Sequence, residues 1–494
     1  MTRVASGAVA GLCVMTGFPP YEWTIVSWAG MAGLVWLLAT SPSARAARWT
    51  AYVYGLSFFG TLLSWLAEVE LLAVYPLVML EALPMLIVGS AVYRYRDASP
   101  FVFVLVAAGS MGLAEYVRVR WPYGGFPWGA PGLTVSGTPF RPSAQWIGAS
   151  GWTVVLIGLA ALVVLVVRRR VSVKALAIAA LGMLALGFAG NLWPAIPQGA
   201  SRVATIVQGN SPCPGARCPN ERILIYESHL ALTQTIDPGT TDLVVWPESS
   251  TGAVTDPVQH PAIGEAIGIE AARIGAAMIV GGDRDAGPEN FINANVIFDS
   301  TGSMIGEYRK RHPVPFGEYV PLRPLLEWIP ALDRVPRDMI RGVDPVLIDL
   351  GGVPLATVIS YEGAFARYER EAVADGARLL VVATNEASFG DTPSSDQFIA
   401  ISRLRAAEFG LDIVHAAVTG RSAFVLADGS VIDRTGLYQT GMITGTVHAR
   451  SAGLTLYARW GDWFQVTVML GYLSLRVRGR LEQLAIPNRS SLDH

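Results

Sequence analysis

The stretch Leu355-Ala-Thr-Val-Ile-Ser-Tyr-Glu362 is an apolar run that ends in a hydroxyl and a carboxylate. Its β-branched, apolar first half predicts a buried strand over 354–359. A helical pattern over 365–376 and a second apolar run over 378–383 follow it. Strands that alternate with helices in this way predict an α/β layered domain with buried sheets.

Two further segments place reactive side chains beside predicted strands. Val244-Val-Trp-Pro-Glu248 ends in a carboxylate at a strand end, where restricted water raises the pKa of a Glu and suits a general base. Lys310 follows the strand 304–308, and its ammonium suits a developing oxyanion. Glu318, in the stiff loop that follows, would orient a partner. Taken singly, such residues are more often structural, so only their combination indicates chemistry.

The rest of the polar half shows the same alternation from about residue 202. Candidate helices fill 220–236, 258–274 and 395–409. The segment Asp299-Ser-Thr-Gly-Ser303 is typical of a hairpin turn. The remaining candidate strands are 202–208, 242–246, 276–281, 294–299, 345–350, 413–418 and 422–427.

Residues 1–192 differ in composition from this half. Charged residues make up 15% of the chain and apolar residues 52%, against roughly 25% charged in a soluble protein. A membrane-spanning helix needs ~20 apolar residues. The sequence therefore predicts a polytopic α-helical membrane bundle of about eight spans joined to the α/β domain. The apolar runs cover roughly 4–18, 23–40, 50–66, 71–92, 101–115, 148–167, 172–192 and 463–475.

Basic residues decide the expected orientation. With the N-terminus inside, the inward loops hold basic clusters at 45–48, 94–96, 168–174 and 476–480. The exceptions are Arg118, Arg120 and Arg141. A signal peptide fits the first run less well, because further spans follow at once. The expected domains are a seven-helix bundle over 1–192, an extracytoplasmic domain over 193–462, a last span over 463–480 and a cytoplasmic tail over 481–494.

Acidic and aromatic residues of the apolar half form a further group. Glu68, Glu81 and Glu115 lie in or beside apolar runs, where a carboxylate is either functional or paired. The loop 121–129 is rich in Pro, Gly and aromatic residues, which excludes a regular helix. We expect its rings at the depth of the lipid headgroups.

The cysteines and histidines limit the chemistry. Cys213 and Cys218 close a short loop, for which we expect a disulfide outside the cytoplasm. A metal pair is the alternative, but no second Cys or His pair stands nearby. The six histidines show no metal-binding spacing, and no Gly-rich phosphate loop is present. A net charge of −2 gives no support for nucleic-acid binding. We therefore expect no metal, no cofactor and no nucleic acid.

In sequence order, Glu248, Lys310 and the strand-end position 360 resemble the nitrilase superfamily. Seven apolar spans before this domain and one after it resemble the apolipoprotein N-acyltransferase family in particular. The resemblance covers nearly the whole chain and implies an αββα sandwich over the outer face of a bacterial cytoplasmic membrane. Its most specific segments are Trp246-Pro-Glu248, Val314-Pro-Phe-Gly-Glu-Tyr-Val-Pro321, Tyr361-Glu362, Thr384-Asn385, Arg405-Ala-Ala-Glu-Phe-Gly410 and Tyr457-Ala-Arg-Trp-Gly-Asp462.

The resemblance also implies roles. Glu248 matches the general base, Lys310 matches the lysine that stabilises the tetrahedral intermediate, and Ser360 stands at the nucleophile position. The implied reaction moves an acyl chain from a membrane phospholipid to the nucleophile. From there the chain passes to the α-amino group of the diacylglyceryl-cysteine at a lipoprotein N-terminus. The accessory positions are Glu318, Tyr361, Glu362 and Asn293.

The chain departs from the family at the nucleophile, because the family has Cys where this chain has Ser360. A thiol, with a pKa of about 8.5, is readily converted to its nucleophilic form. A serine hydroxyl usually needs a histidine relay or a comparable base. Ser388 stands where the family has Trp, and Gln397 where it has His. Several changes around one site favour a diverged relative over a single engineered replacement.

Three functions follow from these residues. The first is an acyltransferase that uses Ser360. The second is a catalytically impaired paralogue that binds lipid or lipoprotein. The third is a serine-using amidase or esterase on the same scaffold.

Overall fold

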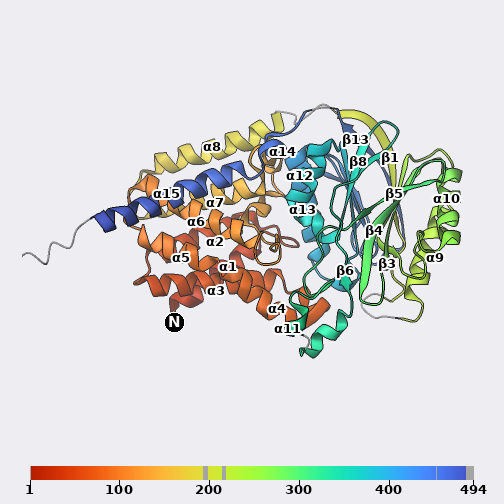
Figure 1. Ribbon diagram of the computed structural model, residues 1–494. Coiled ribbons are helices and arrows are strands. Elements are labelled where there is room, and N and C mark those ends of the chain that lie inside the picture. Colours follow the sequence, from red (N-terminus) through yellow and green to blue (C-terminus); the bar gives the residue numbers. More distant parts are fainter. Residues whose placement is uncertain (1, 193–197, 214–217, 327, 452, 486–494) are drawn as a thin grey trace, which may run out of the picture.

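The computed structural model describes residues 2–192, 198–213, 218–326, 328–451 and 453–485. Figure 1 shows a bundle of helices on one side and a β-rich half beside it. The bundle is built from α1 (Thr2–Met15), α2 (Thr24–Ala39), α3 (Ala44–Leu62), α4 (Leu66–Ala82), α5 (Met85–Arg94), α6 (Pro100–Arg118), α7 (Ala144–Val167), α8 (Val173–Leu192) and α15 (Trp463–Ala485).

The predicted run 71–92 is divided between α4 and α5, and each of the other runs overlaps one of these helices. Within the described residues, four helical segments are long and apolar enough to cross a membrane. They are Leu66–Arg94, Pro100–Arg118, Arg141–Val167 and Val173–Leu192. Helix α8 exposes Ile178, Leu181 and Phe188 along its outer face, which is typical of a helix that faces lipid.

Two of the acidic residues in the apolar half are paired. The guanidinium of Arg118 binds the carboxylates of Glu81 at 2.8 Å and Glu115 at 2.7 Å. All three side chains are buried. A buried charge requires such a partner, so these carboxylates hold α4 and α6 together.

The β-rich half contains two sheets that lie face to face. The first has the order β13-β1-β2-β3-β4-β5, with β6 paired to β4, and the second has the order β12-β11-β10-β9-β8-β7. The first-sheet strands are β1 (Gln198–Gln208), β2 (Leu243–Thr251), β3 (Ala277–Asp285), β4 (Asn290–Phe298), β5 (Met304–Arg309), β6 (Asp338–Met339) and β13 (Gly441–Arg450). The second-sheet strands are β7 (Leu347–Asp349), β8 (Pro354–Ile359), β9 (Leu379–Thr384), β10 (Ile413–Ala417), β11 (Ala423–Val425) and β12 (Val431–Arg434).

Parallel pairing at the centre of each sheet explains the apolar runs. β1, β2 and β3 are parallel neighbours, as are β8, β9 and β10. Strands covered on both faces need apolar side chains throughout, and every residue of β2 and β9 is buried. Because parallel strands end at the same edge of a sheet, the residues after β8 and β9 lie close together.

Helices cover the outer face of each sheet. α9 (Glu221–Thr233) and α10 (Pro261–Ile274) pack on the first sheet, where Ile267 meets Val244 and Met278. α12 (Ala366–Asp375) and α13 (Ser394–Phe409) pack on the second sheet, and their apolar residues share one core with the bundle. The result is the predicted αββα sandwich, and it meets the bundle through its α12–α13 layer (Figure 1).

The sequence set the end of the last helix too early. Its apolar run stops at about 475, and the predicted span ends at 480, whereas α15 continues to Ala485. Arg, Leu, Glu and Gln are good helix formers, so they extend the helix beyond its apolar part. Part of the predicted tail is therefore helical, and its remainder, 486–494, lies outside the described residues.

Candidate active site

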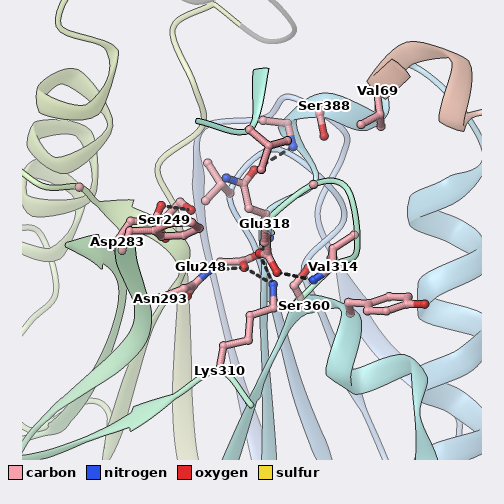
Figure 2. A pocket seen from close by; sticks show the side chains of 18 of the residues that line it. Val69, Glu248, Ser249, Asp283, Asn293, Lys310, Val314, Glu318, Ser360 and Ser388 are labelled. Atoms are coloured by element: carbon pink, nitrogen blue, oxygen red, sulfur yellow. Dashed lines mark hydrogen bonds and ion pairs between the residues drawn. The ribbon is translucent and has the colours of Figure 1, made fainter. Parts of the chain in front are cut away.

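A cavity of about 800 Å³ lies between the sandwich and the bundle. Its polar wall contains Glu248, Lys310 and Ser360, and Figure 2 shows these side chains meeting from separate strands. Its apolar wall contains Trp65, Leu66, Val69, Phe126 and Trp128 from the bundle and its loop. A pocket of this size with one polar and one apolar wall suits a ligand that has a reactive head and a hydrocarbon chain.

Glu248 is fixed by three donors. Its Oε1 accepts hydrogen bonds from Asn293 Nδ2 at 2.7 Å and from Lys310 Nζ at 3.1 Å. Its Oε2 accepts from the backbone N–H of Asn385 at 2.7 Å. The side chain is 5% exposed, so this carboxylate is held in one orientation at the edge of the cavity.

Lys310 is the cation at the centre of this wall. Its Nζ donates to Glu248 and also, at 2.5 Å, to Glu318, which accepts a second hydrogen bond from the backbone N–H of Val314 at 2.7 Å. Burial alone would lower the pKa of Lys310, but the two carboxylates outweigh it and hold that pKa above its ordinary value. Burial raises the pKa of Glu318, and Lys310 opposes this. Lys310 therefore stays an ammonium ion inside the protein.

Ser360 stands in the turn that follows β8. Its φ is +51°, a left-handed conformation that is strained for a residue other than glycine. The turn brings the side chain to the cavity, as in other folds where a nucleophile follows a strand. Within the described residues, the only hydrogen bond of its Oγ is a long one of 3.4 Å, donated by Thr384.

Tyr361 and Glu362, the two residues after Ser360, make contacts with different parts of the protein. Tyr361 lines the cavity and donates from its hydroxyl to the carbonyl of Gly125 at 2.9 Å. Glu362 is fully buried behind the turn and accepts hydrogen bonds from the backbone N–H of Ile359 and of His312 at 2.9 Å each. It thereby ties the nucleophile turn to the segment after Lys310, although burial raises its pKa.

Several residues of the cavity carried no assigned role in the sequence. The backbone N–H of Asn385 could not be foreseen from side-chain patterns, although the segment Thr384-Asn385 stood out. Trp65 and Val69 come from a helix far away in the sequence. Asp283, which accepts a hydrogen bond from Ser249 Oγ at 2.9 Å and binds Arg222 at 3.3 Å, adds a further carboxylate to the polar wall.

Cys213 and Cys218 form a disulfide just before α9. The first turn of that helix brings Glu221 and Arg222 to the cavity. Across the part of the chain that the structure describes, no cluster of three or more His, Cys, Asp or Glu side chains has the geometry to hold a metal ion.

Comparisons with known proteins agree with this division of the chain. Residues 199–456 match the carbon-nitrogen hydrolase family, and residues 10–162 match the apolipoprotein N-acyltransferase N-terminal domain. The apolipoprotein N-acyltransferase of Methylococcus capsulatus is 29% identical over 96% of both chains. That of Sinorhizobium medicae is 31% identical over 92% of both chains. A solved amidase from Nesterenkonia covers 52% of this chain and 92% of its own, at 17% identity and a TM-score of 0.37.

The sandwich, with its Glu248–Lys310 pair, is a carbon-nitrogen hydrolase domain, and it is joined here to a helical bundle. The two apolipoprotein N-acyltransferases named above match this chain over almost their whole length. The chain belongs to the apolipoprotein N-acyltransferase family.

Proposed function

We propose that this protein transfers an acyl chain from a membrane phospholipid to the α-amino group of the N-terminal diacylglyceryl-cysteine of lipoproteins, with Ser360 as the acyl carrier. The observation that carries the proposal is the single cavity that joins the Glu248–Lys310–Ser360 wall to the apolar side chains of the bundle. A phospholipid ester has the same two parts, a polar carbonyl and a long apolar chain.

In the first half-reaction, Glu248 accepts the proton of Ser360 while Oγ attacks the ester carbonyl carbon. The carbonyl oxygen becomes an oxyanion, which the ammonium of Lys310 stabilises. The bond to the glycerol oxygen then breaks, and the leaving lysophospholipid takes the proton from Glu248. Ser360 is left as an acyl ester.

In the second half-reaction, the acceptor amine attacks the same carbonyl carbon. Glu248 accepts the proton that the amine nitrogen loses and returns it to Ser360 Oγ as the carbon–oxygen bond breaks. The products are an amide and the free serine. Asn293 and the backbone N–H of Asn385 keep Glu248 oriented through both steps.

We propose an integral membrane setting for this chemistry. The eight predicted runs would span a bacterial cytoplasmic membrane, with both termini in the cytoplasm. The sandwich would then lie on the extracytoplasmic face. The basic clusters of the inward loops support this orientation. So does the Cys213–Cys218 disulfide, since disulfides persist in oxidising compartments.

A specific observation favours a second candidate, a paralogue that binds lipid or lipoprotein without turnover. Both oxygens of Glu248 are already hydrogen-bonded, and the Oγ of Ser360 has only the 3.4 Å contact with Thr384 among the described residues. A serine normally needs a stronger base at closer range. We therefore expect slow acyl transfer rather than the rate of a thiol enzyme.

The test uses the full chain in phospholipid vesicles with a synthetic diacylglyceryl-cysteine peptide. The proposal predicts a triacylated peptide and a lysophospholipid in equal amounts, both absent from the Ser360→Ala variant. Free fatty acid that forms equally with and without peptide would instead identify a serine esterase. Bound lipid without either product would identify the non-catalytic paralogue.

A further inference from the structure

A second cavity of about 340 Å³ lies where the bundle and the sandwich join. Its walls come from α6, α7 and α15 of the bundle and from α12, α13 and α14 (Leu456–Trp460) of the sandwich. It shares no lining residue with the cavity that contains Ser360. The loop at 126–130 stands between the two, because Phe126 and Trp128 line the first cavity while Pro127 and Ala130 line the second.

The carboxylates in the walls of this cavity are already neutralised. Asp462 binds Arg120 at 2.7 Å. Glu408 binds Arg405 and also accepts the backbone N–H of Ala149 at 2.7 Å. The third carboxylate, that of Glu115, is bound by Arg118. These pairs contribute no net charge to the cavity.

Two further arginines of the wall have no carboxylate partner among the described residues. Arg370 donates to the backbone carbonyls of Ala458 at 2.9 Å and Arg459 at 2.7 Å. Arg367 donates to the carbonyls of Val119 at 3.2 Å and Gly124 at 2.9 Å. Carbonyls leave the charge of a guanidinium uncompensated, so the cavity carries an excess of positive charge.

An unused donor lies in the same wall. Arg405 is 7% exposed, and its Nε–H has no hydrogen-bond partner in the part of the chain that the structure describes. A buried donor without a partner is costly. Together with Arg367 and Arg370, Arg405 forms an arginine cluster, and the planar guanidinium group can bind two phosphate oxygens at once.

The position of the cavity indicates where its phosphate comes from. It lies between helices of the bundle and the sandwich, at the level where Figure 1 shows α14 beside the end of α15. Trp460 of α14 lines the cavity and is 66% exposed, and Trp463 of α15 lines it too. Tryptophan is enriched at the membrane–water interface, so the two rings indicate that this cavity lies at the depth of the lipid headgroups.

We propose that this second cavity binds the phosphate of an anionic membrane phospholipid that does not react. The Arg367–Arg370–Arg405 cluster holds the phosphate, and the acyl chains lie along α15 below Trp463. The bound lipid joins the sandwich to the bundle. It also lies against the loop whose other side faces Ser360, because Arg367 and Tyr361 bind the adjacent residues Gly124 and Gly125.

The test counts retained lipids by native mass spectrometry on the full chain from bilayers of phosphatidylcholine with a minor share of phosphatidylglycerol. The parent protein is expected to retain one phosphatidylglycerol that the Arg367→Gln/Arg370→Gln double variant does not. Its affinity in the variant is expected to fall roughly tenfold or more. The control is Arg421→Gln/Arg434→Gln, which removes two arginines that share Asp396 away from the cavity.

Further measurements distinguish a lipid headgroup from free phosphate and provide a test if the double variant does not fold. Inorganic phosphate should raise the melting temperature of the parent less than phosphatidylglycerol does, and equal effects would overturn the headgroup assignment. Equal retention of phosphatidylglycerol by the parent and the double variant, or of phosphatidylcholine and phosphatidylglycerol by the parent, would overturn the site itself. If the double variant does not fold, Arg370→Gln alone and the lipid competition on the parent decide the question.

Discussion

The two sides of the polar wall differ in how many hydrogen bonds fix their side chains. On one side, Glu248, Lys310 and Glu318 form a chain of short contacts, and both oxygens of Glu248 are occupied. On the other side, Ser360 stands in a strained turn with one 3.4 Å contact. None of the hydrogen bonds described for Glu248 involves Ser360, so under our proposal the charged side would stay unchanged when the residue at 360 is replaced. The proposal then predicts that the rate depends on how easily the group at 360 loses its proton.

Removing the central cation should have the largest effect on this wall. Lys310→Met keeps the approximate length of the side chain but leaves Glu248 and Glu318 buried without a counter-charge. We expect acyl transfer to fall by at least about 100-fold and the free energy of unfolding by about 3–5 kcal/mol. Mass-spectrometric product assays and denaturant unfolding measure the two effects. A variant with parental stability would show that the wall is not an interdependent cluster.

Replacing the weakly held nucleophile should act in the opposite direction. Ser360→Cys supplies a group that loses its proton far more readily while the charged side stays unchanged, so we expect acyl transfer roughly 100-fold faster than in the parent. The rate of lysophospholipid release is the measurement, with Ser360→Ala as the inactive control. A cysteine variant no faster than the parent would place the rate limit elsewhere.

Low pH should reduce the stability of the folded protein, because His229 lies buried behind Glu248 and becomes protonated more readily in the unfolded chain. This imidazole is fully buried, accepts the backbone N–H of Gly209 at 3.1 Å and lies 3.1 Å from Ser250 Oγ, two residues after Glu248. Burial lowers its pKa to about 4, against about 6.5 in the unfolded chain. The folded protein therefore keeps the ring neutral while the unfolded chain takes up a proton.

The resulting contribution of about 3 kcal/mol is fully present above about pH 6.5 and is lost as the pH falls to about 4. Denaturant unfolding of the parent and of His229→Gln across this range measures it. The two proteins should differ in how steeply their stability falls. Parallel curves would mean that His229 takes up its proton equally readily in the folded and the unfolded protein.

The smallest effect is expected at the disulfide, whose two cysteines do not line the cavity. Cys213 and Cys218 close a loop with a sequence separation of 5, and so short a loop restricts the unfolded chain only modestly. Cys213→Ser/Cys218→Ser should lower the free energy of unfolding by about 2 kcal/mol, with acyl transfer nearly unchanged. A large loss of transfer in the double variant would show that the first turn of α9 positions the polar wall.

The sequence predicted the helices and strands whose own pattern of apolar residues shows which positions are buried. The strand over 354–359 and the helix over 395–409 agree with β8 and α13 to within one residue, because buried strands and helices differ in apolar periodicity. Strand β13 was missed. Most of its residues are partly buried or exposed, and Gly441 and Gly445 weaken the apolar pattern.

The sequence identified the polar side chains of the candidate site but not the contacts between them. The residues that meet at Glu248 come from β4 and from the ends of β5 and β9, so no local pattern reports their contact. The apolar wall was missed because Trp65 comes from the bundle. Its ring packs on that of Phe389 in the sandwich, with 4.6 Å between the ring centroids. Contacts of this kind depend on tertiary packing rather than on propensity.

The central claim is that Ser360 carries the acyl chain. The most direct test incubates the full chain with phospholipid in the absence of acceptor, digests it and measures the mass of the peptide that contains Ser360. The account predicts that this peptide gains one acyl chain as an ester, and that the gain disappears when the diacylglyceryl-cysteine peptide is added. An unmodified Ser360 in protein that nevertheless forms triacylated peptide would contradict it.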